Sequence, residues 1–272
     1  MFAMPAIRRL ACVASLLCAA IRPGWAGPAE LPVALRPDAP YLSVPAGTLA
    51  SVLSGGSSDN APTPVAAFAL RTRPVTVAEF LRFTDAQPEW SRTQVPALFA
   101  DGNYLHDMEV LGAAQRGAQA VTNVSWFAAQ AFCESEQARL PTWYEWEYVA
   151  AADATHADAR KDPAWRARIL GWYSQPASQR QLRVGGDANF YGVQDMHGLI
   201  WEWVDDFNAL LVSADSRNQG DPDQLQYCGA GAISLQDREN FAILMRVALL
   251  SSLSGTDSTM DLGFRCARSL AP

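Results

Sequence analysis

Apolar residues begin to recur at helical spacing just after residue 75. Val77, Phe80 and Leu81 fall on one face of a helix. Thr76 and Glu79 are three residues apart at the start of this run, which is the pattern of a capping box, in which each side chain accepts a hydrogen bond from the other residue's backbone. The pattern predicts a helix that begins after Thr76.

Three further helices are predicted from similar signals. Ser125 can cap a helix whose apolar stripe includes Cys133, so this cysteine is expected on the buried side. A second capping box spans Thr142–Glu145, behind Pro141. Residues 162–170 open with Asp-Pro and form a short helix, because proline is tolerated in the first helical turn.

Strand signals are short and scattered. Residues 41–47 and 65–70 are the clearest apolar runs before the first helix. Residues 88–120 show no sustained period and are expected to form a long packed loop. Residues 241–250 fit the helical and the alternating template equally, so their structure stays open. After residue 171, short apolar runs alternate with turn residues, as in an irregular, sheet-poor domain.

The first 26 residues form a separate unit. Arg8 and Arg9 precede an eleven-residue apolar run, Leu10–Ala20, and Gly24–Ala26 ends in small residues. This is the pattern of a cleaved secretory signal peptide, and the run is shorter than the roughly 20 residues of a transmembrane helix. We therefore expect a periplasmic or secreted protein without a membrane span, in which residues 27–40 form an extended lead-in.

Charge and cysteine content narrow the range of partners. The first 26 residues hold three arginines and no acid, so the remaining chain carries 18 basic and 28 acidic residues, a net charge of −10. This charge argues against nucleic acid as a partner. The remaining cysteines are Cys133, Cys228 and Cys266, and three cysteines in an oxidising compartment suggest one disulfide and one leftover thiol.

The loop Gly192–Trp203 is a candidate cation site. Asp195 and Glu202 supply carboxylates and Gly198 frees backbone carbonyls, and such oxygens suit Ca²⁺. A tight turn into a buried strand explains the same pattern. His197 is expected to be a structural donor rather than a metal ligand, because no two of the three histidines have a metal-ligand spacing.

A second polar group precedes the apolar run 241–250. Asp237, Arg238 and Glu239 lie just before this run, and Arg246 lies inside it. A buried arginine needs a carboxylate partner. A pair between Arg246 and Glu239 or Asp237 is either purely structural or lines a pocket as acid/base groups and an anion clamp.

The chain carries several motifs in a fixed order. They are Pro74–Phe80, Val124–Trp126, Arg139–Thr142 with Glu145–Tyr148, Gly192–Trp203 and Gly263–Cys266. Together they resemble the formylglycine-generating enzyme family, also called the sulfatase-modifying factor family, whose domain is a variant of the C-type lectin fold. The resemblance implies a single α+β domain over residues 41–270, with little regular secondary structure.

The resemblance also implies a structural ion and a disulfide. We call Gly192–Trp203 the acidic loop. In the family, the loop that matches it binds Ca²⁺ through two side chains and two backbone carbonyls. The implied ligands are Asp195, Gly198, Ile200 and Glu202. The family also pairs the cysteine of the second helix with that of the Gly-Phe-Arg-Cys end, which implies a disulfide between Cys133 and Cys266.

The chain departs from the copper-dependent members of the family. In those members two cysteines that bind Cu(I) follow a Gly-Gly-Ser-Trp stretch, whereas residues 228–232 here read Cys-Gly-Ala-Gly-Ala and residues 233–241 contain no cysteine. We therefore expect no copper-thiolate site and no formylglycine synthesis on sulfatases. The chain is instead similar to an exported, cysteine-poor branch that includes the nitrite reductase accessory protein and the pyoverdine-maturation protein of bacteria.

Two functions stay open at this point. One is a periplasmic oxidoreductase-type maturation factor that acts on a small molecule or peptide, with Asp237, Arg238, Glu239 and Arg246 at its site. The other is a non-catalytic accessory module that binds a periplasmic metalloenzyme, such as copper nitrite reductase, during maturation.

Overall fold

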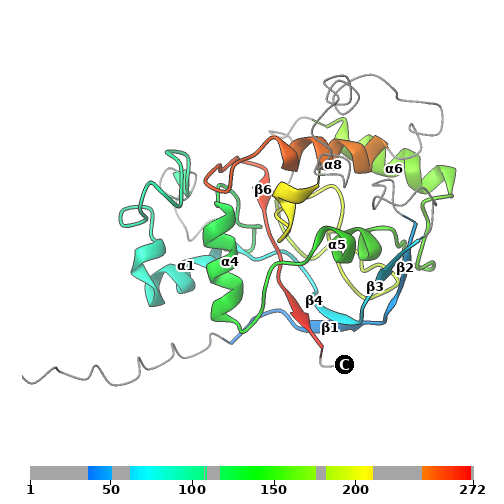
Figure 1. The fold of residues 1–272 in the computed structure, drawn as a ribbon, viewed down its shortest axis with the longest axis horizontal. Helices are drawn as coiled ribbons and strands as arrows, with labels where there is room; N and C mark the ends of the chain where they lie inside the picture. The colour runs from blue at the N-terminus through cyan, green and yellow to red at the C-terminus, as the bar shows by residue number, and fades with distance from the viewer. Residues whose placement is uncertain are drawn as a thin grey trace, which may run out of the picture. The chain divides into compact units, whose positions relative to one another are not determined.

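In a computed structural model, four short strands come first along the described chain, a run of helices follows, and the remaining short strands lie between and after the last helices (Figure 1). The structure describes residues 36–50, 62–106, 108, 117–175, 182–210 and 241–270, all within one compact unit, Val33–Pro272. The strands are β1 (Tyr41–Val44), β2 (Gly47–Leu49), β3 (Thr63–Val65), β4 (Phe68–Arg71), β5 (Trp201–Glu202), β6 (Leu262–Gly263) and β7 (Ala267–Ser269). The helices are α1 (Val77–Ala86), η1 (Pro88–Trp90), α4 (Trp126–Ser135), α5 (Trp143–Ala150), α6 (Pro163–Tyr173), η3 (Phe207–Ala209) and α8 (Phe241–Ser251).

Strand β4 is the centre of the largest sheet. It pairs antiparallel with β1 on one side and with β7 on the other, so Leu70 lies opposite both Leu42 and Ala267. All four β4 residues are buried, as expected for a strand covered on both faces. The C-terminal strand thus closes the sheet begun by the first strand (Figure 1).

The apolar run 65–70 was predicted as one strand, and the structure divides it. Val65 ends β3, which pairs with β2, whereas Phe68 begins β4, which pairs with β1. The run therefore changes partner between two sheets, which is a long-range effect that no local pattern reports. The remaining small sheet joins β5 to β6 in parallel.

The predicted helix starts are confirmed. Thr76 and Thr142 each form a complete capping box with the glutamate three residues later, and Ser125 caps α4 through the backbone of Ala128. Asp162 caps α6, which continues beyond the predicted end at residue 170 to Tyr173. The ambiguous run 241–250 lies within helix α8.

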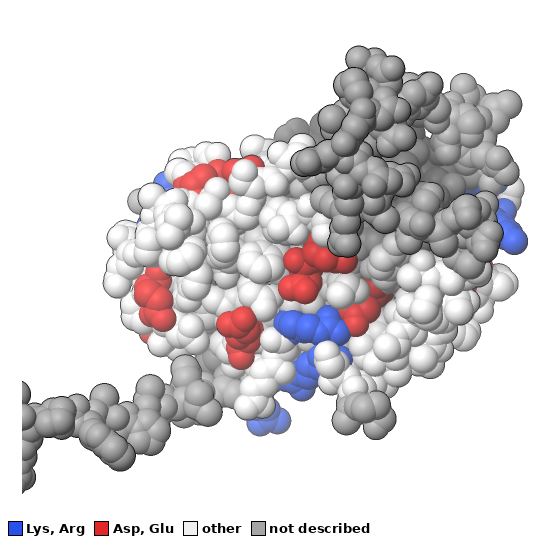
Figure 2. Space-filling view, in the orientation of Figure 1, with Lys and Arg blue, Asp and Glu red and all other residues white. Residues whose placement is uncertain are grey.

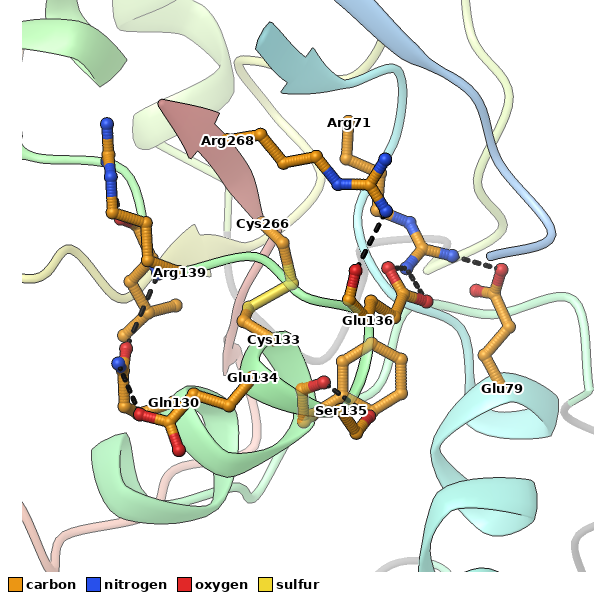
Figure 3. The surroundings of a disulfide bond; sticks show 12 residues. Arg71, Glu79, Gln130, Cys133, Glu134, Ser135, Glu136, Arg139, Cys266 and Arg268 are labelled. Atoms are coloured by element: carbon orange, nitrogen blue, oxygen red, sulfur yellow. Dashed lines mark hydrogen bonds and ion pairs between the residues drawn. A yellow bond between two sulfur atoms is a disulfide. The ribbon is translucent and has the colours of Figure 1, made fainter. Parts of the chain in front are cut away.

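A disulfide and an aromatic cluster fix the core beside this sheet. Cys133 of α4 and Cys266 are joined across 133 residues, with Cα atoms 5.5 Å apart, and both are buried. Phe132 and Phe264, their neighbours in sequence, pack edge to face with ring centroids 5.3 Å apart. The bond ties α4 to the C-terminal segment (Figure 3).

A buried charge network lies next to the disulfide. Arg71 donates to both carboxylate oxygens of Glu136, at 2.7 and 2.8 Å, and also to Glu79. Tyr41 donates to Glu136 at 2.7 Å. The network therefore connects β1, β4, α1 and the end of α4 (Figure 3). Buried charges need such partners, because moving an unpaired ion from water into the protein interior costs on the order of several kcal/mol.

Surface charge and helix length are the two features that bear on possible partners. On the face drawn in Figure 2, charged side chains form small groups in a largely uncharged surface, and near the middle of the view basic and acidic side chains lie side by side. Within the described ranges, no helix is long and apolar enough to span a bilayer.

Candidate functional site

The acidic loop, Gly192–Trp203, has three left-handed backbone positions, the first of which is Gly192 with φ +79°. Asp195 has φ +58° and Gly198 has φ +85°. The Asp195 carboxylate accepts hydrogen bonds from the backbone N–H groups of Gly185 at 2.7 Å and Gly186 at 3.0 Å. Asp195 therefore fastens the loop to the neighbouring turn.

Glu202, the second carboxylate of the loop, is buried against a cation. Its two oxygens accept from Nε and Nη2 of Arg265 at 2.7 and 2.8 Å, and from the Trp146 indole at 2.8 Å. The same guanidinium donates to the backbone carbonyls of Gln194 at 2.9 Å and Asp195 at 3.1 Å. Arg265 thus places a positive charge inside the loop, between its carboxylate and two of its carbonyls.

These contacts bear on how the loop would hold calcium. Asp195 and Glu202 offer the hard oxygens that Ca²⁺ prefers, and Gly198 and Ile200 lie between them as the resemblance requires. The fit is partial, because an ion here would share Glu202 with Arg265. Among the residues that the structure describes, no three His, Cys, Asp or Glu side chains gather as a metal site. Calcium binding therefore stays a prediction.

His197, a residue of this loop, packs between aromatic side chains. Trp172 stacks on its ring, whereas Trp146 and Trp165 meet it edge to face, with centroid distances of 5.6 to 6.2 Å. Burial, together with the nearby charge of Arg246, lowers the pKa of His197 to about 3. The imidazole is therefore neutral near pH 7.

The hydrogen bonds of His197 determine its tautomer. Nε2 lies 2.7 Å from the carbonyl oxygen of Ala150, and a carbonyl can only accept, so Nε2 carries the proton. Nδ1 is then the acceptor for the Tyr173 hydroxyl, 3.3 Å away. His197 is a structural donor, as the sequence predicts.

Arg246 of α8 lies on the other side of Tyr173. Its Nε and Nη2 donate to the two oxygens of Glu147, both at 2.7 Å, and Nη1 donates to the Tyr173 hydroxyl at 2.7 Å. The guanidinium also lies over the Trp146 ring, 4.9 Å from its centroid. Both charges of the pair are buried, at 5% exposure for Arg246 and 3% for Glu147.

The carboxylate partner of Arg246 is a residue that sequence analysis missed. Burial raises the pKa of Glu147, and the charge of Arg246 opposes this shift. A signal for Glu147 existed, because it shares one helical face with the buried Trp143, Trp146 and Ala150. A charged residue on the apolar side of a helix requires a partner.

Two cavities meet at His197. The larger, of about 300 Å³, is lined by Ala152, Asp153, Ala154, Trp165, Arg168, Ile169, Trp172, Gly186, Asp187, Ala188, Asn189, Val193, Asp195, Met196 and His197. The smaller, of about 20 Å³, touches the Arg246–Glu147 pair, and it has room for about one water molecule. Trp165, Ile169 and His197 line both cavities, so the buried pair supports one wall of the larger one.

The structure brings together only part of the predicted site. Asp195, Gly198, Ile200 and Glu202 share one loop, and Arg246 reaches His197 through Tyr173. The predicted acids and arginine at Asp237, Arg238 and Glu239, and the thiol of Cys228, lie outside the described residues.

Comparisons with known proteins agree on one family. The model of the "Sulfatase-modifying factor enzyme 1-like domain" matches residues 32–270. Hercynine oxygenase of Mycolicibacterium smegmatis is 29% identical over 172 residues, which are 52% of this chain and 37% of the relative. The formylglycine-generating enzyme of Bos taurus is 26% identical over 178 residues, 56% of this chain and 44% of the relative.

A third relative is named as an inactive enzyme. The inactive C-alpha-formylglycine-generating enzyme 2 of Bos taurus is 28% identical over 160 residues, 54% of this chain and 49% of the relative. The matched stretches span half or less of the length of these three relatives. A solved structure titled "Crystal Structure of CarF" aligns with a TM-score of 0.44 at 18% identity, covering 86% of this chain and 99% of that one.

Proposed function

This chain belongs to the sulfatase-modifying factor enzyme 1-like family, and we propose that it is an exported, oxidoreductase-type maturation factor acting on a small molecule or peptide. The observation that carries the proposal is the cavity of about 300 Å³ beside His197, which lies at the lower end of the size range of ligand sites. Two curated relatives named hercynine oxygenase support an oxidoreductase-type reaction.

In this proposal His197, Glu147 and Arg246 position a substrate rather than transfer protons to it. Both nitrogens of His197 are engaged, by Ala150 and Tyr173, so neither is left to exchange a proton with a ligand in the cavity. Glu147 and Arg246 neutralise each other and fix Tyr173. The predicted role of Arg246 as an anion clamp is therefore less well supported than its structural role.

The proposed reaction is not formylglycine synthesis through paired copper thiolates. Of the three cysteines after residue 26, Cys133 and Cys266 form the disulfide and Cys228 remains as a single thiol. A two-thiolate Cu(I) site needs a second soft ligand of this kind. Calcium, where it binds the acidic loop, would have a structural role through Asp195, Gly198, Ile200 and Glu202.

The proposal is tested by filling the cavity from its rim. Ala154 is exposed and lines the cavity, so Ala154→Trp should abolish complementation of a deletion strain while the melting temperature stays unchanged. Ala157 is exposed three residues away and does not line the cavity, so Ala157→Trp is the matched control. Full complementation by a normally folded Ala154→Trp protein would place the function elsewhere.

The second candidate is a non-catalytic accessory module for a periplasmic metalloenzyme such as copper nitrite reductase. The relative named as inactive favours it, as does the closed pairing of Glu147 with Arg246. Turnover separates the two functions, because a catalyst matures many equivalents of product per molecule whereas a binding module acts in stoichiometric amounts. Complementation by Glu239→Gln gives a second criterion, since this change preserves shape and removes a base.

A further inference from the structure

The large cavity presents aromatic surface on one side. Trp165 and Trp172 of α6 line it, and Trp172 is held in place by its stack on His197 and by close contact with Gly198. A fixed indole face attracts cations, because the ring quadrupole is negative above its plane.

A cation of the chain itself already lies on this wall. The guanidinium carbon of Arg168 lies 5.8 Å from the centroid of the Trp172 ring. Arg168 is exposed and lines the cavity, so its side chain indicates where a cationic ligand would lie against Trp172. An exposed side chain of this length can move aside at small cost.

The remaining charges of the lining are acidic. Asp153, Asp187 and Asp195 line the cavity, and Arg168 is the single Lys or Arg among its lining residues within the described chain. Asp153 accepts backbone hydrogen bonds from Thr155 and His156, and Asp195 accepts them from the Gly185 turn. The backbone donors are neutral and fix the carboxylates without cancelling their charge, and Nδ1 of His156 lies 3.1 Å from the Asp153 carboxylate as a further partner. Asp153 and Asp187, which are not among the predicted calcium ligands, outnumber Arg168, so the lining has an excess of negative charge without counting Asp195, and this disfavours anionic ligands.

We propose that this cavity binds an ammonium group, primary or quaternary, held between the indole of Trp172 and the lining carboxylates, of which Asp187 is the exposed one. The inference depends on the proposed function only in assigning this group to the substrate. A divalent metal fits less well, because no three metal-binding side chains converge among the described residues. An ammonium group needs no such convergence, since it interacts with ring faces and with charge at a distance.

The first experiment compares two probes of the same shape. Choline and 3,3-dimethylbutan-1-ol differ by the charged nitrogen alone, and both can be titrated by calorimetry into the mature protein in calcium-containing buffer. We expect choline to bind with a dissociation constant of about 1 to 10 mM, and the uncharged alcohol to bind at least about fivefold more weakly. Equal binding of both probes, or no saturable binding of choline, overturns the proposal.

Variants locate the probe in this cavity. Asp187→Asn should weaken choline binding about threefold, whereas Arg168→Gln should strengthen it about threefold by removing the competing cation. Asp85 is an exposed acid on α1, outside the cavity lining, so Asp85→Asn should change nothing and controls for net charge. Because Asp187 and Arg168 are both exposed, neither change endangers the fold. Equal affinity across all three variants places the choline elsewhere and overturns the proposal.

A peptide pair identifies the source of the ammonium group. A tetrapeptide with a free amino terminus and no lysine should bind if the source is a peptide, and its N-acetylated form should not, whereas a small-molecule amine source leaves both inactive and choline active. Failure of the ammonium inference can be distinguished from failure of the proposed function. Absence of choline binding, with complementation still lost in Ala154→Trp, rejects the ammonium inference and retains the cavity as the functional site.

Discussion

At the scale of single residues, the buried ion pairs depend on contacts that local patterns do not report. Arg246 and Glu147 are 99 residues apart, and Arg265 and Glu202 are 63 apart. The sequence predicted that Arg246 needs a carboxylate, and the structure supplies one from α5. Local signals, such as the burial of Cys133, were correct because they depend on helical spacing alone.

Removing one member of the buried pair should be costly. Glu147→Gln leaves the Arg246 charge without a partner, so the free energy of unfolding should fall by about 3 to 5 kcal/mol in urea titration. Glu147→Gln combined with Arg246→Met removes both charges and should recover a large part of this loss. The exposed pair Arg82–Asp38 is the control, because Arg82→Gln should change stability by less than about 1 kcal/mol. A double variant no more stable than Glu147→Gln would contradict the ion-pair explanation.

At the scale of elements, caps and helix starts were predictable and sheet pairing was not. A capping box needs residues three apart, so Thr76 and Thr142 identified α1 and α5 directly. The division of residues 65–70 between β3 and β4 depends on strands at both ends of the chain. The same limit explains why the cavity beside His197 was missed, since its lining comes from three separate segments between residues 152 and 197.

The disulfide should be a major contribution to the attachment of α4 to the C-terminal segment. On the chain-entropy model, a closed loop of this length stabilises the fold by about 4 to 5 kcal/mol, and native strain makes this an upper value. Cys133→Ala with Cys266→Ala should lower the free energy of unfolding by up to this amount. Cys228→Ala should leave the bond intact, as checked by non-reducing peptide mapping. A peptide map in which Cys228 is joined to either partner would contradict the pairing.

The acidic loop gives the calcium prediction a clear test. An ion that binds only the folded state stabilises it, so chelation should lower the melting temperature, and Asp195→Ala should remove that dependence. The structure sharpens the alternative, because Arg265 already neutralises Glu202 and contacts two loop carbonyls. A melting temperature unchanged by chelator would mean that Arg265 and the hydrogen bonds of Asp195 hold the loop without an ion.

At the scale of the whole molecule, the evidence for the family differs from the evidence for export. The domain was identified from ordered motifs, and the family match over residues 32–270 together with the mixed helices and strands agrees with that assignment. The proposed substrate site is a cavity assembled from separate segments, which neither composition nor spacing encodes. Residues 1–26 lie outside the described residues, so export stays a prediction.

Export should leave a mature protein that begins at Gly27. Signal peptidases require small residues before the cleaved bond, and Gly24 and Ala26 meet this requirement on either side of Trp25. Intact-mass measurement of the protein from the periplasm or medium should match residues 27–272. Ala26→Arg replaces the small residue next to the bond with a large charged one, so this variant should accumulate unprocessed. An oxidising compartment would also allow the Cys133–Cys266 bond to persist. A cell-retained protein that keeps residues 1–26 would remove the basis for both the localisation and the periplasmic function.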